Sequence, residues 1–193
     1  MYEEIDALQE RDQYYVIDYI PYDTDDPRFL KLEEYFERTY LPSFAEKIIR
    51  IILKTIYRFP CAIYVTGPSE DDDSMRLSEA GDTPSRIERT PNNAEPASEA
   101  TIPISIPYDT DISGYPPAEL AAIIRRIILT DGPSSVQVLC SIPHREHPSR
   151  FLISIGGGFS VTVYGAKPRT EATDLLQALA TQEGLFLKHR SER

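Results

Sequence analysis

The sequence predicts an α/β or α+β fold in which helices pack on a mixed β-sheet. Runs rich in β-branched and aromatic residues alternate with longer runs of helical periodicity. The hexapeptide Ile-Pro-Tyr-Asp-Thr-Asp occurs at residues 20–25 and again at 106–111, each time after a β-rich run. Residues 48–53 and 124–129 are identical at five of six positions. These echoes suggest an internal repeat of two related strand–turn–helix units.

The N-terminal part predicts a short helix, a strand and a second helix. Residues 3–10 have apolar side chains at helical spacing, and residues 14–20 are rich in Tyr, Val and Ile, which favours a strand. A helix from Pro27 to about Arg38 is expected next. Asp26 suits its N-cap because Asp accepts hydrogen bonds from unpaired backbone N–H groups, and Pro at the first helical position has no N–H to leave unpaired.

A further helix is expected to restart after Pro42, with Ser43 as its N-cap. Apolar residues cover most of this helix, so it should be the buried central one. Its outward side is a stripe of basic residues at spacings of three and four: Lys47, Arg50, Lys54 and Arg58. Pro60 ends the helix, and residues 61–66 form the next strand.

The C-terminal part predicts strands, two helices and a β-hairpin. Its expected elements are a strand over 101–106, a helix over 118–129, a strand over 136–142, hairpin strands over 151–155 and 159–164, a helix from Thr170 to Gly184, and a short strand over 185–187. Gly156, Gly157 and Gly158 suit the hairpin turn. The two strand–helix–strand crossovers should be parallel and right-handed, and the hairpin antiparallel, which gives a mixed sheet.

The chain is expected to form one domain from residues 1–66 and 101–193, interrupted by residues 67–100. This middle segment is acidic, rich in Pro and Ser, and has few sizeable apolar side chains. Such a segment buries too little apolar surface to offset the entropy of ordering it. We therefore expect a flexible insert or linker there.

The charge distribution bears on the class of partner. The net charge is −11, and residues 1–39 alone contain 12 acidic and 4 basic residues. An acidic surface repels phosphate backbones, so nucleic acid and anionic lipid are not expected as partners. The charge fits either a basic protein partner or simply good solubility.

The sequence predicts a cytoplasmic protein. Its first residues lack the basic and apolar regions of a signal peptide, and its longest apolar block, 48–57, is too short to span a bilayer. Cys61 and Cys140 lie inside apolar strand-like runs, which predicts buried, reduced thiols and no disulfide framework.

The two repeated turns supply the strongest candidate site. If the two units pair side by side, Asp23, Asp25, Asp109 and Asp111 lie along one edge of the sheet. Converging carboxylates could bind Mg²⁺ or Ca²⁺ and support phosphoester hydrolysis through a metal-bound water. Turn chemistry is the alternative, because Asp and Thr also hydrogen-bond nearby backbone N–H groups. Neither turn has the Gly and the distal Glu of a calcium loop.

Other motifs give weaker signals. His144 and His147 could hold a transition metal, but no further His or Cys lies near them to complete a four-ligand shell. The three glycines at 156–158 precede a strand, whereas a phosphate-binding loop precedes a helix. We therefore interpret them as a hairpin turn.

Two groups of residues are candidates for binding. Lys47, Arg50 and Lys54 could receive a phosphate or an acidic peptide, or they could pair with acidic segments of the chain itself. Tyr22 and Tyr108, at the same position of the two repeated turns, could contact a small ligand or pack strand ends.

These observations favour a non-catalytic, intracellular interaction or regulatory module that binds a protein partner and needs no cofactor. High acidity and the lack of a strong catalytic signature are the main reasons. The alternative is an Mg- or Ca-dependent phosphoester hydrolase that uses the paired Asp turns. Oligomeric state does not follow from the sequence.

Overall fold

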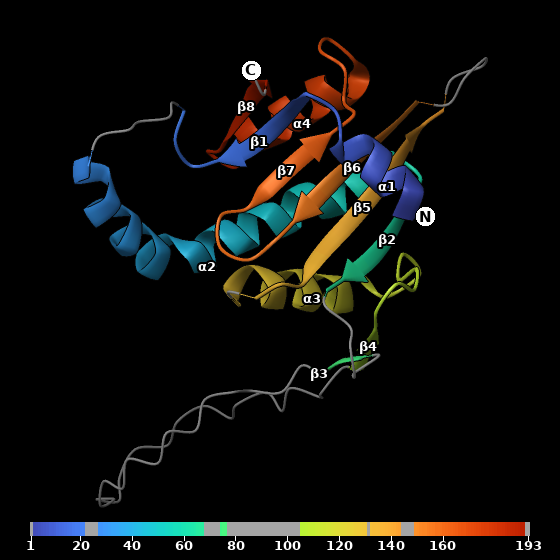
Figure 1. The fold of residues 1–193 in the computed structure, drawn as a ribbon, viewed down its shortest axis with the longest axis horizontal. Helices are drawn as coiled ribbons and strands as arrows, with labels where there is room; N and C mark the ends of the chain where they lie inside the picture. Colours follow the sequence, from blue (N-terminus) through green and yellow to red (C-terminus); the bar gives the residue numbers. More distant parts are fainter. Residues whose placement is uncertain are drawn as a thin grey trace, which may run out of the picture.

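The computed structural model describes residues 2–21, 27–67, 74–76, 105–130, 132–143 and 149–191. Its helices are α1 (Tyr2–Gln9), α2 (Pro27–Arg58), α3 (Pro117–Leu129) and α4 (Glu171–Gln182). Its strands are β1 (Gln13–Asp18), β2 (Cys61–Thr66), β3 (Ser74–Arg76), β4 (Ser105–Pro107), β5 (Ser135–Ile142), β6 (Ser149–Ile155), β7 (Val161–Tyr164) and β8 (Phe186–Ser191). Figure 1 shows one main sheet with helices packed on it, which confirms the predicted fold class.

The main sheet has six strands in the order β2-β5-β6-β7-β1-β8, and every neighbouring pair is antiparallel. The expectation of parallel neighbours is therefore wrong. β1 and β2 do run in the same direction, because four successive antiparallel pairings separate them. However, α2 carries the chain to the far edge of the sheet, and the β5–β6–β7 meander then fills the gap between β1 and β2.

Of the strand expected over residues 101–106, the structure describes only residues 105 and 106. The described strand there is β4, which pairs with β3 in a separate two-stranded ribbon and not in the main sheet. β3 itself comes from the middle segment, 67–100. Within the described ranges, the second expected crossover therefore does not form part of the main sheet, and the internal repeat stays a prediction.

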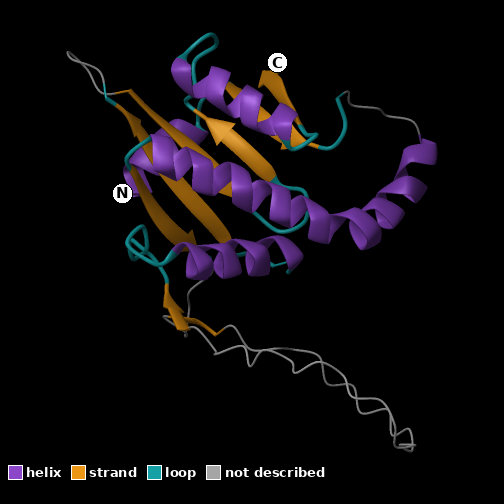
Figure 2. Ribbon diagram, turned by 180° about the vertical axis from the view of Figure 1, so that it is seen from behind, coloured by secondary structure: helices purple, strands orange, loops and turns teal. Residues whose placement is uncertain are grey.

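Three helices cover one face of the sheet. Figure 2 shows α2, α3 and α4 in front of the strands when the molecule is viewed from behind. Alternate strand residues point towards these helices, and the pattern is clear in β2, where Ile63 and Val65 are buried while Ala62 and Tyr64 are half-buried. This alternation is the signature of an antiparallel sheet with one face on the core.

The opposite face, which we call the open face, carries α1 alone among the described helices (Figure 1). Ile5 and Leu8 of α1 pack against Leu139 of β5 and Leu152 of β6, and all four side chains are buried. The short helix predicted at the N-terminus is thus confirmed. Its two apolar side chains cover a small apolar patch of the sheet, and this packing holds the helix in place.

α2 is one continuous helix with Pro42 inside it, so the two separate helices expected on either side of this residue are wrong. Proline removes one helical hydrogen bond and its ring crowds the preceding turn, which usually bends a helix. Figure 2 shows that α2 curves along its length and that its N-terminal part extends beyond the sheet. A bend therefore replaces the expected break.

Most of the remaining elements match their predictions closely, although β8 continues to Ser191, beyond the short strand expected over 185–187. β6 and β7 form the antiparallel hairpin around the three glycines, and α4 begins after Thr170 and is followed by Gly184 with a φ of +69°. Residue Gly184 supplies the left-handed position that often follows a helix.

No helix in the described ranges is both long and apolar enough to cross a membrane.

Candidate functional site

The second repeated turn runs along the outer edge of β2. The N–H of Asp109 donates to the carbonyl of Val65 at 3.1 Å, and the N–H of Ile112 donates to the carbonyl of Ile63 at 2.8 Å. The N–H of Ile63 in turn donates to Oδ1 of Asp111 at 3.1 Å. These bonds satisfy backbone groups that an edge strand otherwise leaves unpaired.

Asp111 performs the turn chemistry that was one of its two expected roles. Its Oδ1 also accepts the N–H of Ser113 at 2.9 Å. Burial acts to raise the pKa of Asp111, but the N–H groups of Ser113 and Ile63 outweigh it, so the pKa lies below its ordinary value of 3.8. Asp109 is exposed and has a φ of +61°, a left-handed conformation that Asp tolerates better than most residues.

The metal hypothesis gains no support from the part of the chain that the structure describes. No group of three or more His, Cys, Asp or Glu side chains there is placed to hold a metal ion. Asp23, Asp25, His144 and His147 lie outside the described residues. The first turn begins with Ile20 after β1, and three strands separate β1 from β2, or about 19 Å across the sheet. A metal site at the paired turns stays an untested expectation.

Tyr108 packs within the fold. Its side chain is half-buried, and its hydroxyl lies 3.2 Å from Oγ of Ser134. Its ring lies so close to Gly67 that a Cβ there would stand 3.0 Å from a ring carbon. Tyr22, its counterpart in the first turn, lies outside the described residues. Tyr108 thus packs against residues next to the end of β2 and the start of β5, as the strand-end role predicts.

The basic stripe of α2 faces α4. Arg50 donates from Nε to Oε2 of Glu183 at 2.9 Å, and Lys54 donates from Nζ to Oε1 of Gln182 at 2.9 Å. Lys54 also lies 3.4 Å from the second carboxylate oxygen of Glu183. Among the described residues, the acidic partner of Arg50 and Lys54 is therefore Glu183, at the end of α4.

The two ends of the stripe also have partners. Nζ of Lys47 lies 4.4 Å from the centre of the Tyr19 ring, in a cation–π geometry. Arg58 pairs with Glu171 at the start of α4. Because the whole stripe is used to join α2 to its neighbours, an external anion would have to compete with these contacts. The structure does not bring Lys47, Arg50 and Lys54 together with Tyr108.

Polar side chains line one end of the open face, where β2 and β6 end and β5 begins. Oγ1 of Thr66 lies 2.8 Å from Oγ of Ser135, and Nε2 of Gln137 donates to Ser135 at 2.9 Å and to Ser154 at 3.0 Å. Gln137 is only 4% exposed, and its Oε1 is buried without a hydrogen-bond partner in the described part of the molecule. The sheet thus presents hydroxyls at this part of the open face, away from the apolar cluster that α1 covers.

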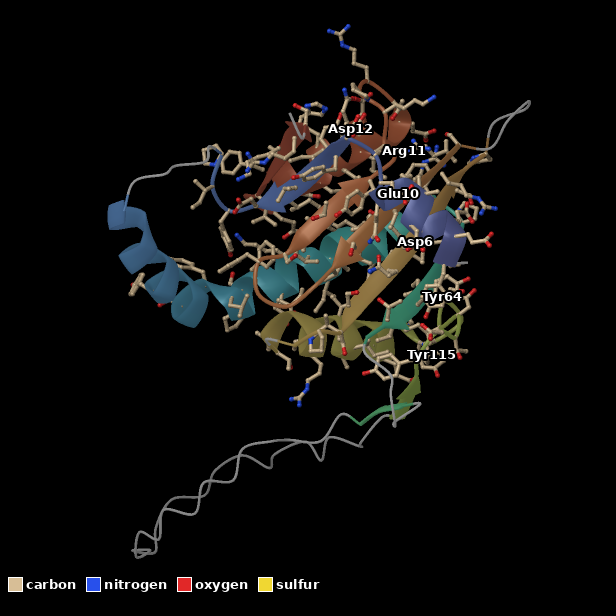
Figure 3. All side chains as sticks on the ribbon, in the orientation of Figure 1. Asp6, Glu10, Arg11, Asp12, Tyr64 and Tyr115 are labelled. Carbon is tan, nitrogen blue, oxygen red and sulfur yellow. The ribbon has the colours of Figure 1, made fainter. Side chains whose placement is uncertain are left out.

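An acidic ridge runs along α1 and the turn after it, at one side of the open face. We define the acidic ridge as the exposed side chains of Glu3, Asp6, Glu10 and Asp12. Figure 3 shows that Asp6, Glu10 and Asp12 lie on the same side of the molecule as Tyr64. Burial of Ile5 and Leu8 fixes which side of α1 is exposed, so packing positions the carboxylates.

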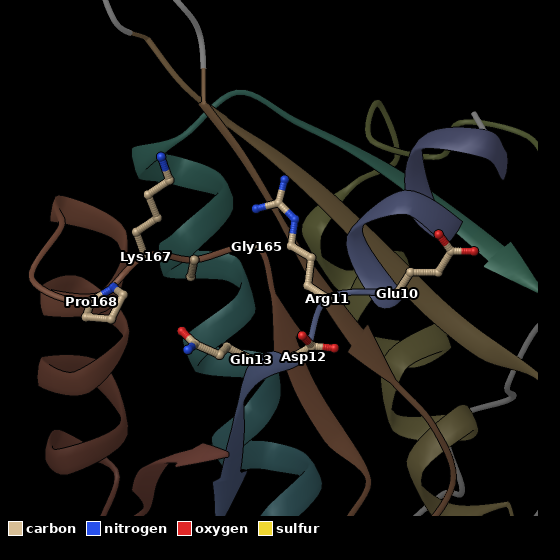
Figure 4. Close-up of a pocket in the computed structure, with 8 residues that line it drawn as sticks. Glu10, Arg11, Asp12, Gln13, Gly165, Lys167 and Pro168 are labelled. Carbon is tan, nitrogen blue, oxygen red and sulfur yellow. The ribbon is translucent and has the colours of Figure 1, made fainter. Parts of the chain in front are cut away.

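Two hollows flank α1. One, of about 390 Å³, lies between α1 and strands β2, β5 and β6, with Tyr64, Leu139 and Arg150 among its lining residues. The other, of about 370 Å³, lies between the α1–β1 turn and the β7–α4 loop. In Figure 4, the cationic groups of Arg11 and Lys167 point to the same side of this second hollow. The open face is therefore uneven as well as polar.

The acidic side chains of this surface could be predicted from the sequence, but the hydroxyl network beside them could not. The acidity of the N-terminal segment was evident, and so was the helical spacing of its apolar residues. The hydroxyl network was not, because Thr66, Gln137 and Ser154 become neighbours through strand order and register. Alternation of polar and apolar residues within each strand was the available signal.

Comparison of the chain with protein-family models, with curated proteins and with solved structures finds no match.

Proposed function

We propose that this protein is a non-catalytic interaction module that binds a basic segment of a partner protein on its open face. The observation that carries the proposal is the position of the acidic ridge beside strands that no other described helix covers. A Lys- and Arg-rich segment is the kind of partner that exposed carboxylates beside an uncovered polar sheet can bind.

Charge complementarity is the first argument. The ridge residues are exposed, and no ion pair within the described ranges occupies Glu3, Asp6, Glu10 or Asp12. Carboxylates of this kind attract a cationic segment over about 10 Å at moderate ionic strength and raise its association rate. By contrast, Glu4 is already paired with Arg150.

Hydrogen-bonding capacity is the second argument. Lys and Arg side chains bring only donors, three and five respectively. The open face offers acceptors in the hydroxyls of Thr66, Ser135 and Ser154. Tyr64 adds a half-buried ring at the same surface, against which an Arg guanidinium or a Lys stem can stack.

The perturbed carboxylates do not point to catalysis. Catalytic groups usually combine a shifted pKa with a place in a cleft. Here the pKa values of Glu46, Asp111 and Glu183 are all lowered, and each carboxylate is explained by ion pairs or hydrogen bonds that hold elements of the fold together. None of these three residues lines either hollow beside α1.

Fluorescence anisotropy with a labelled Lys/Arg-rich peptide tests the proposal. The double variant Asp6→Asn/Glu10→Gln removes two ridge charges and should weaken binding about fivefold, at roughly 0.5 kcal/mol for each exposed pair. Affinity should also fall as salt is added.

A matched control separates a specific surface from general attraction to an acidic protein. Glu119→Gln/Asp174→Asn removes the same number of charges from α3 and α4, on the other side of the sheet. This control should bind the peptide like the wild type. An equal loss in both double variants, or no binding by the wild type at low salt, would overturn the proposal.

A further inference from the structure

Cys61 and Cys140 face each other directly across β2 and β5. The register of the two strands pairs their Cα atoms, and both thiols are free. Cys140 is fully buried in the core, whereas Cys61 is half-buried and starts the edge strand. By strand alternation the Cys61 side chain lies on the same face of β2 as Ile63 and Val65, where it packs against the core, and its Sγ donates to the carbonyl of Phe59 at 3.2 Å.

The local hydrogen-bond pattern shows what kind of strand pair the two cysteines form. The N–H of Ser141 donates to the carbonyl of Pro60 at 2.9 Å, so the adjacent pair exchanges the ladder bond. Ile63, two residues further along β2, directs its own N–H and carbonyl outward to Asp111 and Ile112. Because these directions alternate, Cys61 and Cys140 form a non-hydrogen-bonded pair.

Such a pair has the spacing that a disulfide requires. Directly opposite Cα atoms in a non-hydrogen-bonded antiparallel pair lie about 4.5 Å apart, within the range of about 4.4–6.8 Å found across disulfides. The neighbouring Cys61 thiol and burial both raise the pKa of Cys140, in keeping with this pairing. Neither strand would have to move far to join the two sulfur atoms.

We propose that Cys61 and Cys140 form a thiol–disulfide exchange site, which a low-molecular-weight disulfide oxidises to a cross-strand disulfide. Half-buried Cys61 is the attacking residue. Its thiolate displaces one thiolate from the reagent and forms a mixed disulfide. Cys140 then gives up its proton to the released thiolate, attacks the sulfur of Cys61 and expels the second thiolate. The two cysteines lose two electrons and two protons, and the reagent is reduced to two thiols.

The disulfide would stabilise the fold by linking two strands covalently. It would fasten the edge strand β2 to β5 and close a loop that contains the whole segment between residues 61 and 140. A closed loop of this length restricts the unfolded state strongly, and a rise in melting temperature of roughly 5–10 °C is expected. The proposal does not depend on binding at the acidic ridge.

Intact-mass spectrometry after incubation of the native full chain with bis(2-hydroxyethyl) disulfide tests the proposal. The wild type should lose two hydrogens and keep no adduct. Cys140→Ala should stop at one mixed disulfide on Cys61, and Cys61→Ser should stay unmodified while folded. Circular dichroism of both variants confirms that they are folded, and Cys140→Ser replaces the Ala variant if that one is not.

Three results would overturn the proposal. They are a wild type that retains two alkylatable thiols, a wild type that stops at an adduct, and a disulfide-linked dimer as the main product. Reaction of the folded Cys61→Ser variant at the wild-type rate would also contradict the role given to Cys61.

Discussion

The carboxylate of Asp111 lies 3.1 Å from the backbone nitrogen of Ile63 and accepts its hydrogen bond. This contact joins a turn that precedes α3 to the edge of the main sheet. An acidic side chain therefore completes the backbone hydrogen bonding of β2 at a position where a further strand would otherwise add.

Replacing Asp111 should destabilise the fold. Asp111→Ala leaves the N–H groups of Ile63 and Ser113 without their acceptor, which should lower the free energy of unfolding by about 1–2 kcal/mol in urea denaturation. Asp109→Asn is the control, because Asn also tolerates the left-handed backbone at this exposed position. Equal, small effects of both changes would show that the Asp111 contact contributes nothing.

Glu183 should stabilise the protein only where it is ionised. The Arg50 guanidinium is the main reason that its pKa lies below the ordinary value of 4.5. A carboxylate whose pKa is lowered by folding stabilises above the pKa it has in the unfolded chain, and loses this contribution as the pH falls through its folded pKa. Glu183→Gln should cost about 0.5–1 kcal/mol at neutral pH.

The stability gap between wild type and Glu183→Gln should therefore shrink as urea unfolding is repeated at successively lower pH below 4.5. A gap that stays constant, or that grows as the pH falls, would contradict an ion pair between α2 and α4.

Substitution of two glycines with similar φ angles can separate the cost of backbone strain from the cost of a steric clash. Gly165 and Gly158 have φ angles of +74° and +65°. A Cβ at Gly165 would stand 2.5 Å from a Leu8 methyl and 3.1 Å from the Arg150 carbonyl, whereas a Cβ at Gly158 would meet nothing within 4 Å. Gly158→Ala should cost about 1 kcal/mol from backbone strain alone, and Gly165→Ala clearly more. Equal losses in thermal unfolding would mean that α1 does not pack against this turn.

Pro42 should lower the stability of α2. It is exposed and interior to one continuous helix, so Pro42→Ala should restore a backbone donor and raise the free energy of unfolding by about 1–3 kcal/mol. Unchanged stability would instead favour two helices that meet at Pro42, where proline at a first helical position costs nothing.

Local signals explain most of what the sequence predicted correctly. β2 spans the same residues, 61–66, as the strand expected after Pro60, Thr170 precedes α4, and the three glycines turn the β6–β7 hairpin. Each of these features depends on residues within a few positions of one another. Pro42 is an exception, because α2 continues through this proline as one curved helix where the local signal predicts a break.

Non-local pairing explains what the sequence could not supply. Strand order places β2 at the opposite side of the sheet from β8, and the acceptor of Arg50 is Glu183, 133 residues later. Neither is encoded in local spacing. The contact between Cys61 and Cys140 likewise required the register of β2 against β5, although both strands were predicted.

Methyl NMR during titration with the Lys/Arg-rich peptide tests the central claim most directly. Neighbouring residues on the same strand point to opposite faces, so Ala62 and Thr66 report on the open face while Ile63 and Val65 report on the core. The proposed docking surface predicts shifts for the first pair and little change for the second. Shifts confined to methyls of α3 and α4, or no shifts at saturating peptide, would contradict it.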